Sequence, residues 1–191
     1  MVARANAHSS YRCQFILIAT ANPCKCGYLS DPSRACARTP LCGGEYMGHI
    51  SGPMMDRFDL TVEMPPVPFH DLDLPSDGDT SATVAARVAA AFQIQTDRYR
   101  DHPELRSNAD LEGAHLNTVA TPDRKGQLLL NRAAELFRLS ARGYHRVLRV
   151  GRTIADLAGA NQVTQTHIAE ALSYRLALPN LVHTKDSQKN N

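Results

Sequence analysis

Residues 139–159, LSARGYHRVLRVGRTIADLAG, carry the most regular helical pattern of this 191-residue chain. Ser140 stands just before the pattern and is the expected N-cap, because its hydroxyl can accept a hydrogen bond from a free N–H of the first turn. Apolar and small residues then recur three or four positions apart: Tyr144, Val147, Leu148, Gly151, Ile154, Ala155 and Ala158. Residues at this spacing share one face of a helix, so the pattern predicts a helix with one buried face.

Three other segments after residue 80 show the same period. Thr80 or Ser81 is the expected N-cap of the first segment, and the last one begins near Thr164 and ends before Pro179. Their predicted apolar faces are Val84, Val88, Ala91, Phe92 and Tyr99; then Leu129, Ala133, Leu136 and Phe137; then Ile168, Ala171 and Leu172. The segments predict an all-α domain over residues 80–178, followed by a polar, disordered tail at 179–191.

The first 66 residues have a different character. Residues 14–21, QFILIATA, read as a buried central strand, and residues 57–64, RFDLTVEM, as a second strand. Two strands cannot cover both faces of a buried strand, so we expect residues 1–66 to be the C-terminal part of a larger α/β core. Prolines and acidic residues at 67–79 predict a linker. The predicted fold class is an α/β fragment followed by an all-α domain.

Composition narrows the class of protein. No window of eighteen apolar residues occurs and no signal-peptide pattern is present, so we expect a cytoplasmic protein with no membrane span. The formal net charge of +2 does not by itself indicate nucleic-acid binding. Six arginines are nevertheless concentrated between residues 132 and 152, where a solvated helix surface is the commoner outcome.

Four cysteines lie within one loop, at Cys24, Cys26, Cys36 and Cys42. Such clustering in a cytosolic protein favours metal ligation over disulfides, and four thiolates suit tetrahedral Zn²⁺. The C-x-C spacing is tighter than the usual C-x-x-C, so reduced, unligated cysteines are an equal alternative. Cys13 is expected to be a small core residue.

Four stretches together resemble the ComM/YifB-type Mg-chelatase-like proteins, a branch of the AAA+ ATPases related to the magnesium-chelatase I subunit. The stretches are IATANPCKCGY at 18–28, ISGPMMDRFDL at 50–60, the helix segment at 139–159, and HIAEALSYR at 167–175. The resemblance implies a nucleotide-binding α/β core with a helical lid, assembled into a homo-oligomeric ring with ATP and Mg²⁺ between subunits. Members of the ComM type are linked to DNA, as branch-migration helicases, and the chelatase relatives insert magnesium into porphyrin.

The resemblance also implies roles for single residues. Asn22 matches sensor 1, which orients the attacking water; Arg57 matches the arginine finger; and Arg142 matches sensor 2, which contacts the bound phosphates. Simpler alternatives are a turn at Asn22-Pro23, an ion pair of Arg57 with Asp56 or Asp59, and a solvated face for Arg146 and Arg149. In the cysteine loop, Arg38 stands where relatives carry a ligand, and Cys42 or His49 is the expected substitute.

Neither a G-x-x-x-x-G-K-[ST] phosphate loop nor a strand ending in paired acids occurs in the chain. We therefore expect no ATP hydrolysis by this chain alone, and assign ATP and Mg²⁺ to the full-length parent. The leading hypothesis is the sensor, finger and lid part of an ATP-driven DNA motor. Two alternatives stay open: a non-catalytic zinc, DNA- or protein-binding module, and a magnesium-chelatase-type subunit.

Overall fold

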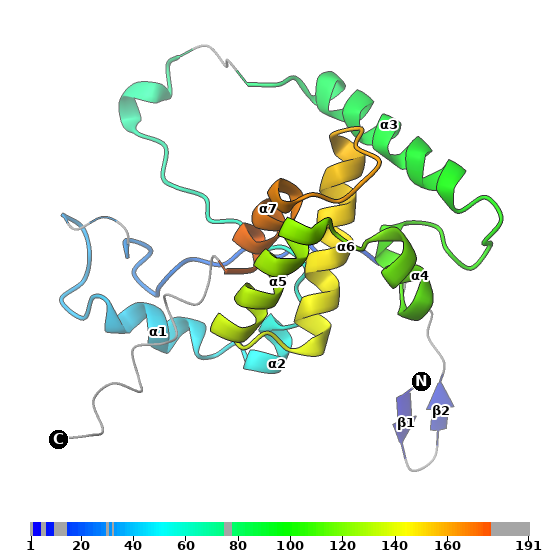
Figure 1. The fold of residues 1–191 in the computed structure, drawn as a ribbon. Helices are drawn as coiled ribbons and strands as arrows, with labels where there is room; N and C mark the ends of the chain where they lie inside the picture. The colour runs from blue at the N-terminus through cyan, green and yellow to red at the C-terminus, as the bar shows by residue number, and fades with distance from the viewer. Residues whose placement is uncertain are drawn as a thin grey trace. The chain divides into compact units, whose positions relative to one another are not determined.

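The computed structural model describes residues 2–4, 7–9, 15–29, 31, 33–74 and 78–176. The chain divides into two compact units, Met1–Met47 and Gly48–Asn191. Figure 1 labels the helices and strands of the chain. The first unit contains an antiparallel pair of three-residue strands and the helix α1 (Leu41–Met47). The strands are β1 (Val2–Arg4) and β2 (Ala7–Ser9), with Val2 opposite Ser9.

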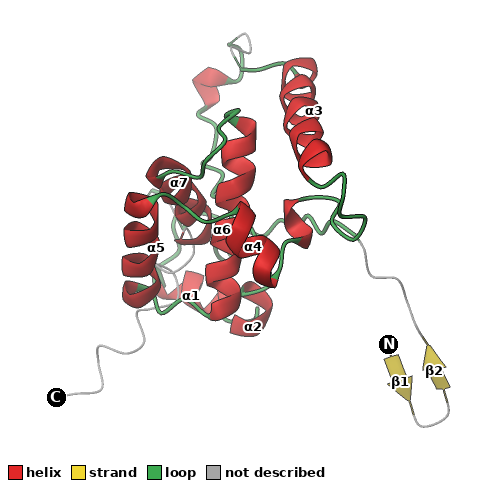
Figure 2. Cartoon of the chain, turned by 45° about the vertical axis from the view of Figure 1, so that its right-hand side comes forward, coloured by secondary structure: helices red, strands yellow, loops and turns green. Residues whose placement is uncertain are grey.

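Helices dominate the second unit (Figure 2). Its elements are α2 (Gly52–Met55), the 3₁₀ turn η1 (Phe69–Asp71), α3 (Ser81–Arg98), the 3₁₀ turn η2 (Asn108–Asp110), α4 (Gly113–Val119), α5 (Arg124–Leu136), α6 (Ala141–Leu157) and α7 (Gln165–Leu176). Helix α6 is central, because α3, η2, α4 and α7 all pack against it. The predicted cap is confirmed: Ser140 Oγ accepts a hydrogen bond of 3.0 Å from Gly143 N.

The core forms around the predicted apolar face of α6. Val147, Leu148 and Ala155 are at most 5% exposed, and they meet Ile168, which is fully buried, on α7. The other buried members of the core are Tyr99, Leu105, Leu111, Leu116, Ala120, Leu130, Ala133, Val163, Ala171 and Leu172. Removal of this apolar surface from water is the main favourable term that holds the helices together.

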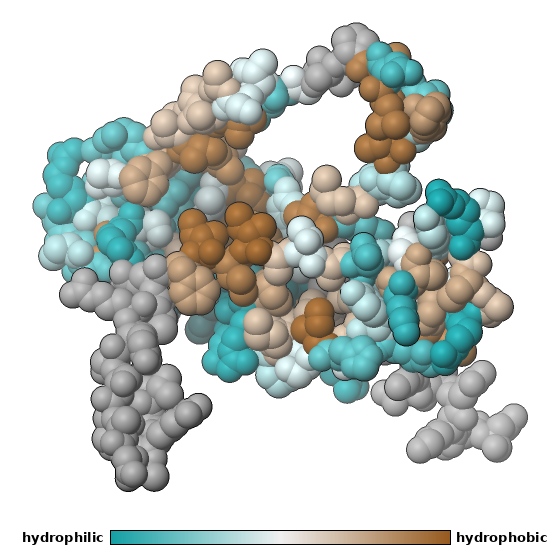
Figure 3. Space-filling view, turned by 180° about the vertical axis from the view of Figure 1, so that it is seen from behind, coloured by the Kyte–Doolittle hydropathy of each residue, from teal (hydrophilic) through white to brown (hydrophobic). Residues whose placement is uncertain are grey.

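Apolar residues also remain at the surface of both units, and Figure 3 shows brown, hydrophobic atoms exposed on one face. On α3 the predicted face is buried only toward its C-terminal end, at Ala91, and at Tyr99 just beyond it. Val88 and Phe92 are more than half exposed. Helical periodicity predicted the helix α3, but three of the five residues of the predicted face, Val84, Val88 and Phe92, are exposed, because neighbouring helices cover only one end of it.

The prediction of α/β structure in residues 1–66 is wrong. Of the first predicted strand, residues 15–21 are described, and neither they nor residues 57–64 form a strand; Phe15, Ile16 and Ile18 are 74–92% exposed. A strand exists only where a second backbone accepts and donates its ladder hydrogen bonds. No described segment lies beside residues 15–21 in this way, so the apolar run has no partner strand among the described residues.

The all-α prediction for the region after residue 80 is confirmed by helices α3 to α7. The predicted linker at 67–79 contains the exposed turn η1, and the boundaries of the linker stay a prediction. The predicted tail at 179–191 and the predicted core residue Cys13 lie outside the described residues. No described helix is both long enough and apolar enough to cross a membrane.

Candidate functional site

The segment that carries Arg57 binds to the helices of its own unit through Asp56. Ser51 caps the short helix α2 and Asp56 follows it, so the carboxylate projects from a fixed turn. Asp56 accepts a hydrogen bond from Ser140 Oγ, 3.1 Å away at the start of α6, and another from the guanidinium of Arg175 on α7. Hydrogen bonds to a charged acceptor are stronger than those between neutral groups. Asp56 therefore ties the MDRFDL segment to two helices.

Two arginines also hold the backbone of this segment. Arg175 donates to the carbonyl oxygen of Phe58 at 3.0 Å, and Arg146 donates to the carbonyl oxygen of Asp56. The side chains of Arg146 and Arg175 are only 13% and 15% exposed. Arg146 Nε lies 2.9 Å from Asp59 Oδ1 but makes no hydrogen bond, so this pair is a Coulombic contact alone. Burial lowers the pKa of Arg146, and the attraction of Asp59 opposes that shift.

The close approach of Arg175 depends on Gly143 in the first turn of α6. A Cβ atom at this position would lie 3.2 Å from Arg175 Nη2 and 3.4 Å from Ser140 Oγ. The space that glycine leaves open lets the guanidinium reach Asp56. Residues 51–59, 140–146 and 175 thus form one site, which we call the docking cluster.

Arg57 and Arg142 are exposed at this cluster. The only hydrogen bond of the Arg57 side chain with a described residue is to the carbonyl oxygen of Pro53, at 3.1 Å. The predicted alternative, an ion pair of Arg57 with Asp56 or Asp59, is not formed. Within the described part of the chain, Arg142 has neither a hydrogen bond nor an ion pair.

The other arginines of α6 are bound by protein partners. Arg149 donates to the carbonyl oxygen of Leu111 at 2.8 Å and lies 3.6 Å from Glu112. Arg152 is 2% exposed and contacts Asp156. The expected solvated face is therefore wrong for Arg146 and Arg149, since both are mostly buried. A hollow of about 420 Å³ lies along this side of α6, lined by Glu112, Ala141, Arg142, His145, Arg146 and Arg149.

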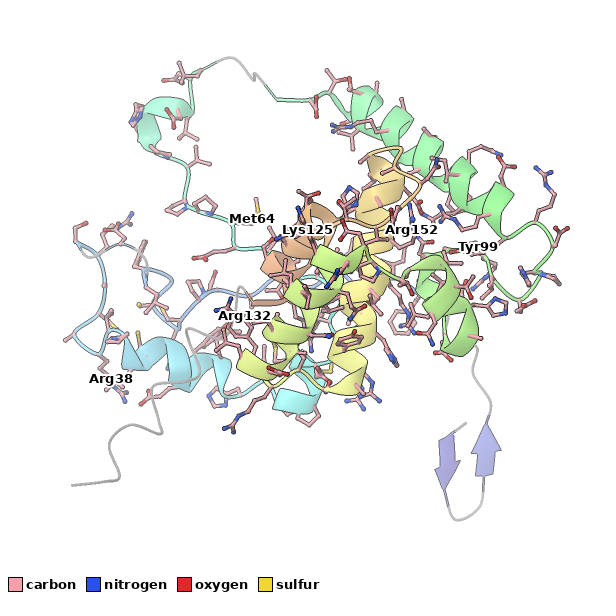
Figure 4. All side chains as sticks on the ribbon, in the orientation of Figure 1. Arg38, Met64, Tyr99, Lys125, Arg132 and Arg152 are labelled. Atoms are coloured by element: carbon pink, nitrogen blue, oxygen red, sulfur yellow. The ribbon has the colours of Figure 1, made fainter. Side chains whose placement is uncertain are left out.

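A buried ionic network joins α3 to α6. The Asp156 side chain is 0% exposed and accepts hydrogen bonds from Arg98, Arg152 and Asn108. Arg152 also donates to the carbonyl oxygens of Ala160 and Asn161, just beyond α6. Figure 4 labels Arg152 on α6 and Tyr99 at the end of α3. We did not predict this network, because its members are far apart in the sequence.

The cysteine loop in the first unit brings three of its thiols together. The sulfur atoms of Cys24, Cys26 and Cys42 all lie within 4.8 Å of one another, and Cys24 Sγ is 3.0 Å from Cys26 Sγ. Cys24 is fully buried and Cys42 is 8% exposed. Cys36, in the same loop, is half-buried.

The environment separates these thiols chemically. Hydrogen bonds from Cys24 and from the backbone N–H groups of Tyr28 and Cys36 lower the pKa of Cys26 to about 6. Burial, together with Cys36, raises the pKa of Cys42 to about 11. Four thiolates suit tetrahedral Zn²⁺, whose Zn–S bonds are about 2.3 Å long, and the sulfur atoms of three of them, Cys24, Cys26 and Cys42, converge here. Zinc at Cys24, Cys26, Cys36 and Cys42 stays a prediction.

The remaining predicted positions lie elsewhere. Asn22 is exposed just before the cysteine loop, in the first unit, and its role as sensor 1 stays a prediction. Arg38 is exposed and pairs with Glu45 at 2.5 Å. His49, the alternative zinc ligand, is exposed and belongs to the second unit.

Comparison with known proteins matches both parts of the chain. Residues 78–175 match the family described as magnesium chelatase, subunit ChlI C-terminal, and residues 1–72 match magnesium chelatase, subunit ChlI. Competence protein ComM of Haemophilus influenzae is 36% identical over 176 residues, which is 92% of this chain and 33% of ComM. The uncharacterized protein YifB of Salmonella typhimurium is 37% identical over 183 residues, 95% of this chain and 35% of YifB.

The chain therefore spans about a third of the length of these relatives. The matched ranges include the docking cluster, the cysteine loop and all helices from α3 to α7. The resemblance to ComM and YifB is confirmed, and the chain belongs to the magnesium-chelatase subunit ChlI family, whose C-terminal region its helical part forms.

Proposed function

We propose that this chain supplies the arginine finger, sensor 2 and lid of a ring-forming ATPase that remodels DNA. The observation that carries the proposal is the difference between the arginines of α6. Arg146, Arg149 and Arg152 are held by protein acceptors, whereas Arg142 has no partner in the described part of the chain. An exposed guanidinium without a protein partner is suited to an anionic ligand such as a phosphate.

The docking cluster explains why Arg57 and Arg142 act on one ligand. Arg57 directly follows Asp56, and Arg142 stands two residues after Ser140. The hydrogen bonds between Asp56 and Ser140 therefore bring the backbones that bear both arginines to one place. Two positive charges on one anchored surface favour a highly charged ligand, and the triphosphate of ATP is such a ligand.

ATP with Mg²⁺, bound in the full-length parent, supplies the phosphoryl group that is transferred to water. Since the chain contains no phosphate loop, we place Arg57 and Arg142 at a nucleotide bound by a neighbouring subunit of a ring. Their guanidinium groups stabilise the negative charge that develops on the phosphate oxygens during hydrolysis. Asn22, as sensor 1, orients the attacking water.

DNA is the partner that we propose, and two facts support it. The resemblance extends over 92% of the chain to a relative named a competence protein. The long signature segments at 50–60 and 139–159 are those of the ComM type. Hydrolysis and DNA binding belong to a protein longer than this chain, because the chain covers about a third of its relatives.

The test is hydrolysis of ATP by this chain and by a longer form that also carries a phosphate loop. We expect turnover only in the longer form, and a loss of at least about 10³-fold in kcat for Arg57→Ala, the low end for an arginine finger. We expect Arg142→Ala to lose activity too. Arg132→Ala is the matched control, an exposed arginine on α5 (labelled in Figure 4) that should keep full activity.

A longer form that retains full activity with both Arg57→Ala and Arg142→Ala contradicts the proposed roles. Hydrolysis by the 191-residue chain itself contradicts the assignment of the phosphate loop to another segment. Circular dichroism of each variant shows whether a loss of activity reflects unfolding, which we do not expect at exposed side chains.

A zinc-dependent binding module is a second candidate, favoured by the convergence of three cysteine thiols. In this function the ion would fix the loop at residues 24–42 as a contact surface for DNA or a protein. Fluorescence anisotropy of labelled DNA, with and without a zinc chelator, distinguishes the candidates. DNA binding by this chain that disappears with the chelator favours the module, and binding unaffected by the chelator excludes it.

A further inference from the structure

A second group of metal-binding side chains lies in the helical unit, away from the docking cluster. The ligand atoms of His102, Glu104 and His115 all lie within 4.8 Å of one another. His102 Nδ1 is 3.4 Å and His115 Nε2 is 3.9 Å from Glu104 Oε1. The two imidazole rings meet edge to face, with their centroids 4.7 Å apart. We propose that these three residues bind one divalent transition-metal ion.

The spacing of the three ligand atoms suits such an ion. Bonds of about 2.0–2.1 Å to nitrogen and oxygen in a tetrahedral site separate the ligand atoms by about 3.4 Å. The two measured separations are at or slightly above this value, so small side-chain rotations bring all three groups onto one ion. Two imidazoles and one carboxylate are a ligand set for zinc and for other first-row ions such as nickel.

The backbone around the site is fixed by buried neighbours. His102 donates its backbone N–H to the carbonyl oxygen of Tyr99, and Leu105 donates to that of His102, both at 2.9 Å. Tyr99 and Leu105 are 4% and 7% exposed, so the residues that flank His102 and Glu104 belong to the core. His115 directly precedes Leu116 on α4, and the Leu116 residue is 1% exposed. An ion therefore binds to a largely preformed site, with little ordering of the chain to offset its affinity.

The three side chains are 43–58% exposed, so water can occupy the remaining coordination positions and the ion can enter from solvent. The ion would join the segment after α3 to α4. That segment continues to Asn108, which hydrogen-bonds to Asp156 at the centre of the buried network. A bound ion should thus stabilise the packing of α3 and α4 on α6.

The experiment is isothermal titration calorimetry with Ni²⁺ on the full chain, after removal of any polyhistidine tag. Cys24→Ser and Cys26→Ser provide the background, because cysteine thiolates would also bind the probe. We expect one Ni²⁺ per chain in this background. We expect His102→Ala and His115→Ala each to weaken binding at least about ten-fold, since even residues that only orient a ligand contribute ten- to hundred-fold.

His145→Ala is the matched control, an exposed histidine on α6 outside the group. It should bind Ni²⁺ like the background. Binding that is equal in the background and in His115→Ala overturns the proposal, as does the absence of binding in the background. The second result would mean that the group contains only contacts of the two imidazoles with Glu104. Hydrogen exchange provides an independent readout, and Ni²⁺ should slow exchange at residues 102–116 in the background but not in His115→Ala.

Discussion

Replacement of Asp156 by asparagine should destabilise the helical unit more than any surface substitution. The change removes one negative charge and leaves the rest of the residue nearly the same size. Asp156 forms ion pairs with both Arg98 and Arg152 in the native protein. The Arg98 side chain is 22% exposed and can turn toward water, but Arg152 is 2% exposed and remains buried beside a neutral amide.

The expected cost follows from this unpaired charge. Removal of one partner of a buried ion pair costs about 3–5 kcal/mol, because the other charge stays desolvated. We expect about 3 kcal/mol, the lower end, because Arg152 keeps its hydrogen bonds to the carbonyl oxygens of Ala160 and Asn161. Domains of this kind have a total free energy of unfolding of about 5–15 kcal/mol. The variant should therefore fold with greatly reduced stability.

The assay is equilibrium unfolding in urea, followed by far-UV circular dichroism. At a typical m-value of about 1–3 kcal/mol/M, the loss lowers the midpoint by about 1–3 M. Asp97→Asn is the matched control, because it breaks an exposed pair between Asp97 on α3 and Arg100 just beyond the end of that helix, and it should leave the midpoint unchanged. A loss below about 1 kcal/mol for Asp156→Asn would refute the claim that Asp156 compensates the buried charge of Arg152.

Three further predictions concern the same elements. Burial alone would raise the pKa of Asp156, but the hydrogen bonds from Arg98 and Asn108 and the charge of Arg152 outweigh it, so the pKa lies below the ordinary value of 3.8. The stability that the ionised Asp156 carboxylate contributes is present above pH 3.8 and is lost as the pH falls below that value. The urea midpoint of the wild type should therefore decrease as the pH is lowered below 3.8, and the midpoint of Asp156→Asn should change less. Ser140→Ala should cost about 1 kcal/mol for the lost cap and more for the lost contact with Asp56, whereas Thr80→Ala should lose its cap and an exposed contact with Thr83 within the same turn, as urea unfolding will show. Cys24→Ser should weaken Zn²⁺ binding at least about ten-fold in a chelator competition, and an unchanged affinity would exclude zinc from the cysteine loop.

The docking cluster shows how far sequence reasoning reaches into the site. The signature segments at 50–60 and 139–159 identified Arg57 and Arg142 as residues of interest, and the structure finds both exposed. Neither segment indicated that Asp56 would bind Ser140 and Arg175, which lie 84 and 119 residues further along the chain. A single sequence contains no signal for such pairs, because the local sequence around one partner does not indicate where the other partner lies.

The arginines of α6 illustrate the same limit within one helix. Their spacing predicts that Arg142, Arg146 and Arg149 lie on one side, and they do line one hollow. Their spacing cannot predict that Asp56 and Leu111 supply carbonyl oxygens to two of them. An arginine is solvated or bound according to the atoms that other segments place beside it.

The sequence by itself determined the helices α3, α5, α6 and α7, the cap at Ser140 and the collection of four cysteines in one loop, but not the short helices α2 and α4. These features depend on residues within about four positions of one another, or on composition, so the local pattern is enough. The tertiary structure alone decided that residues 15–21 form no strand and that Asp156 pairs with two arginines. It also decided that Arg142 has no side-chain partner among the described residues while its neighbours on α6 are bound. Ladder hydrogen bonds, ion pairs and burial each need a partner that is distant in the chain, and only the folded arrangement of the helices supplies it.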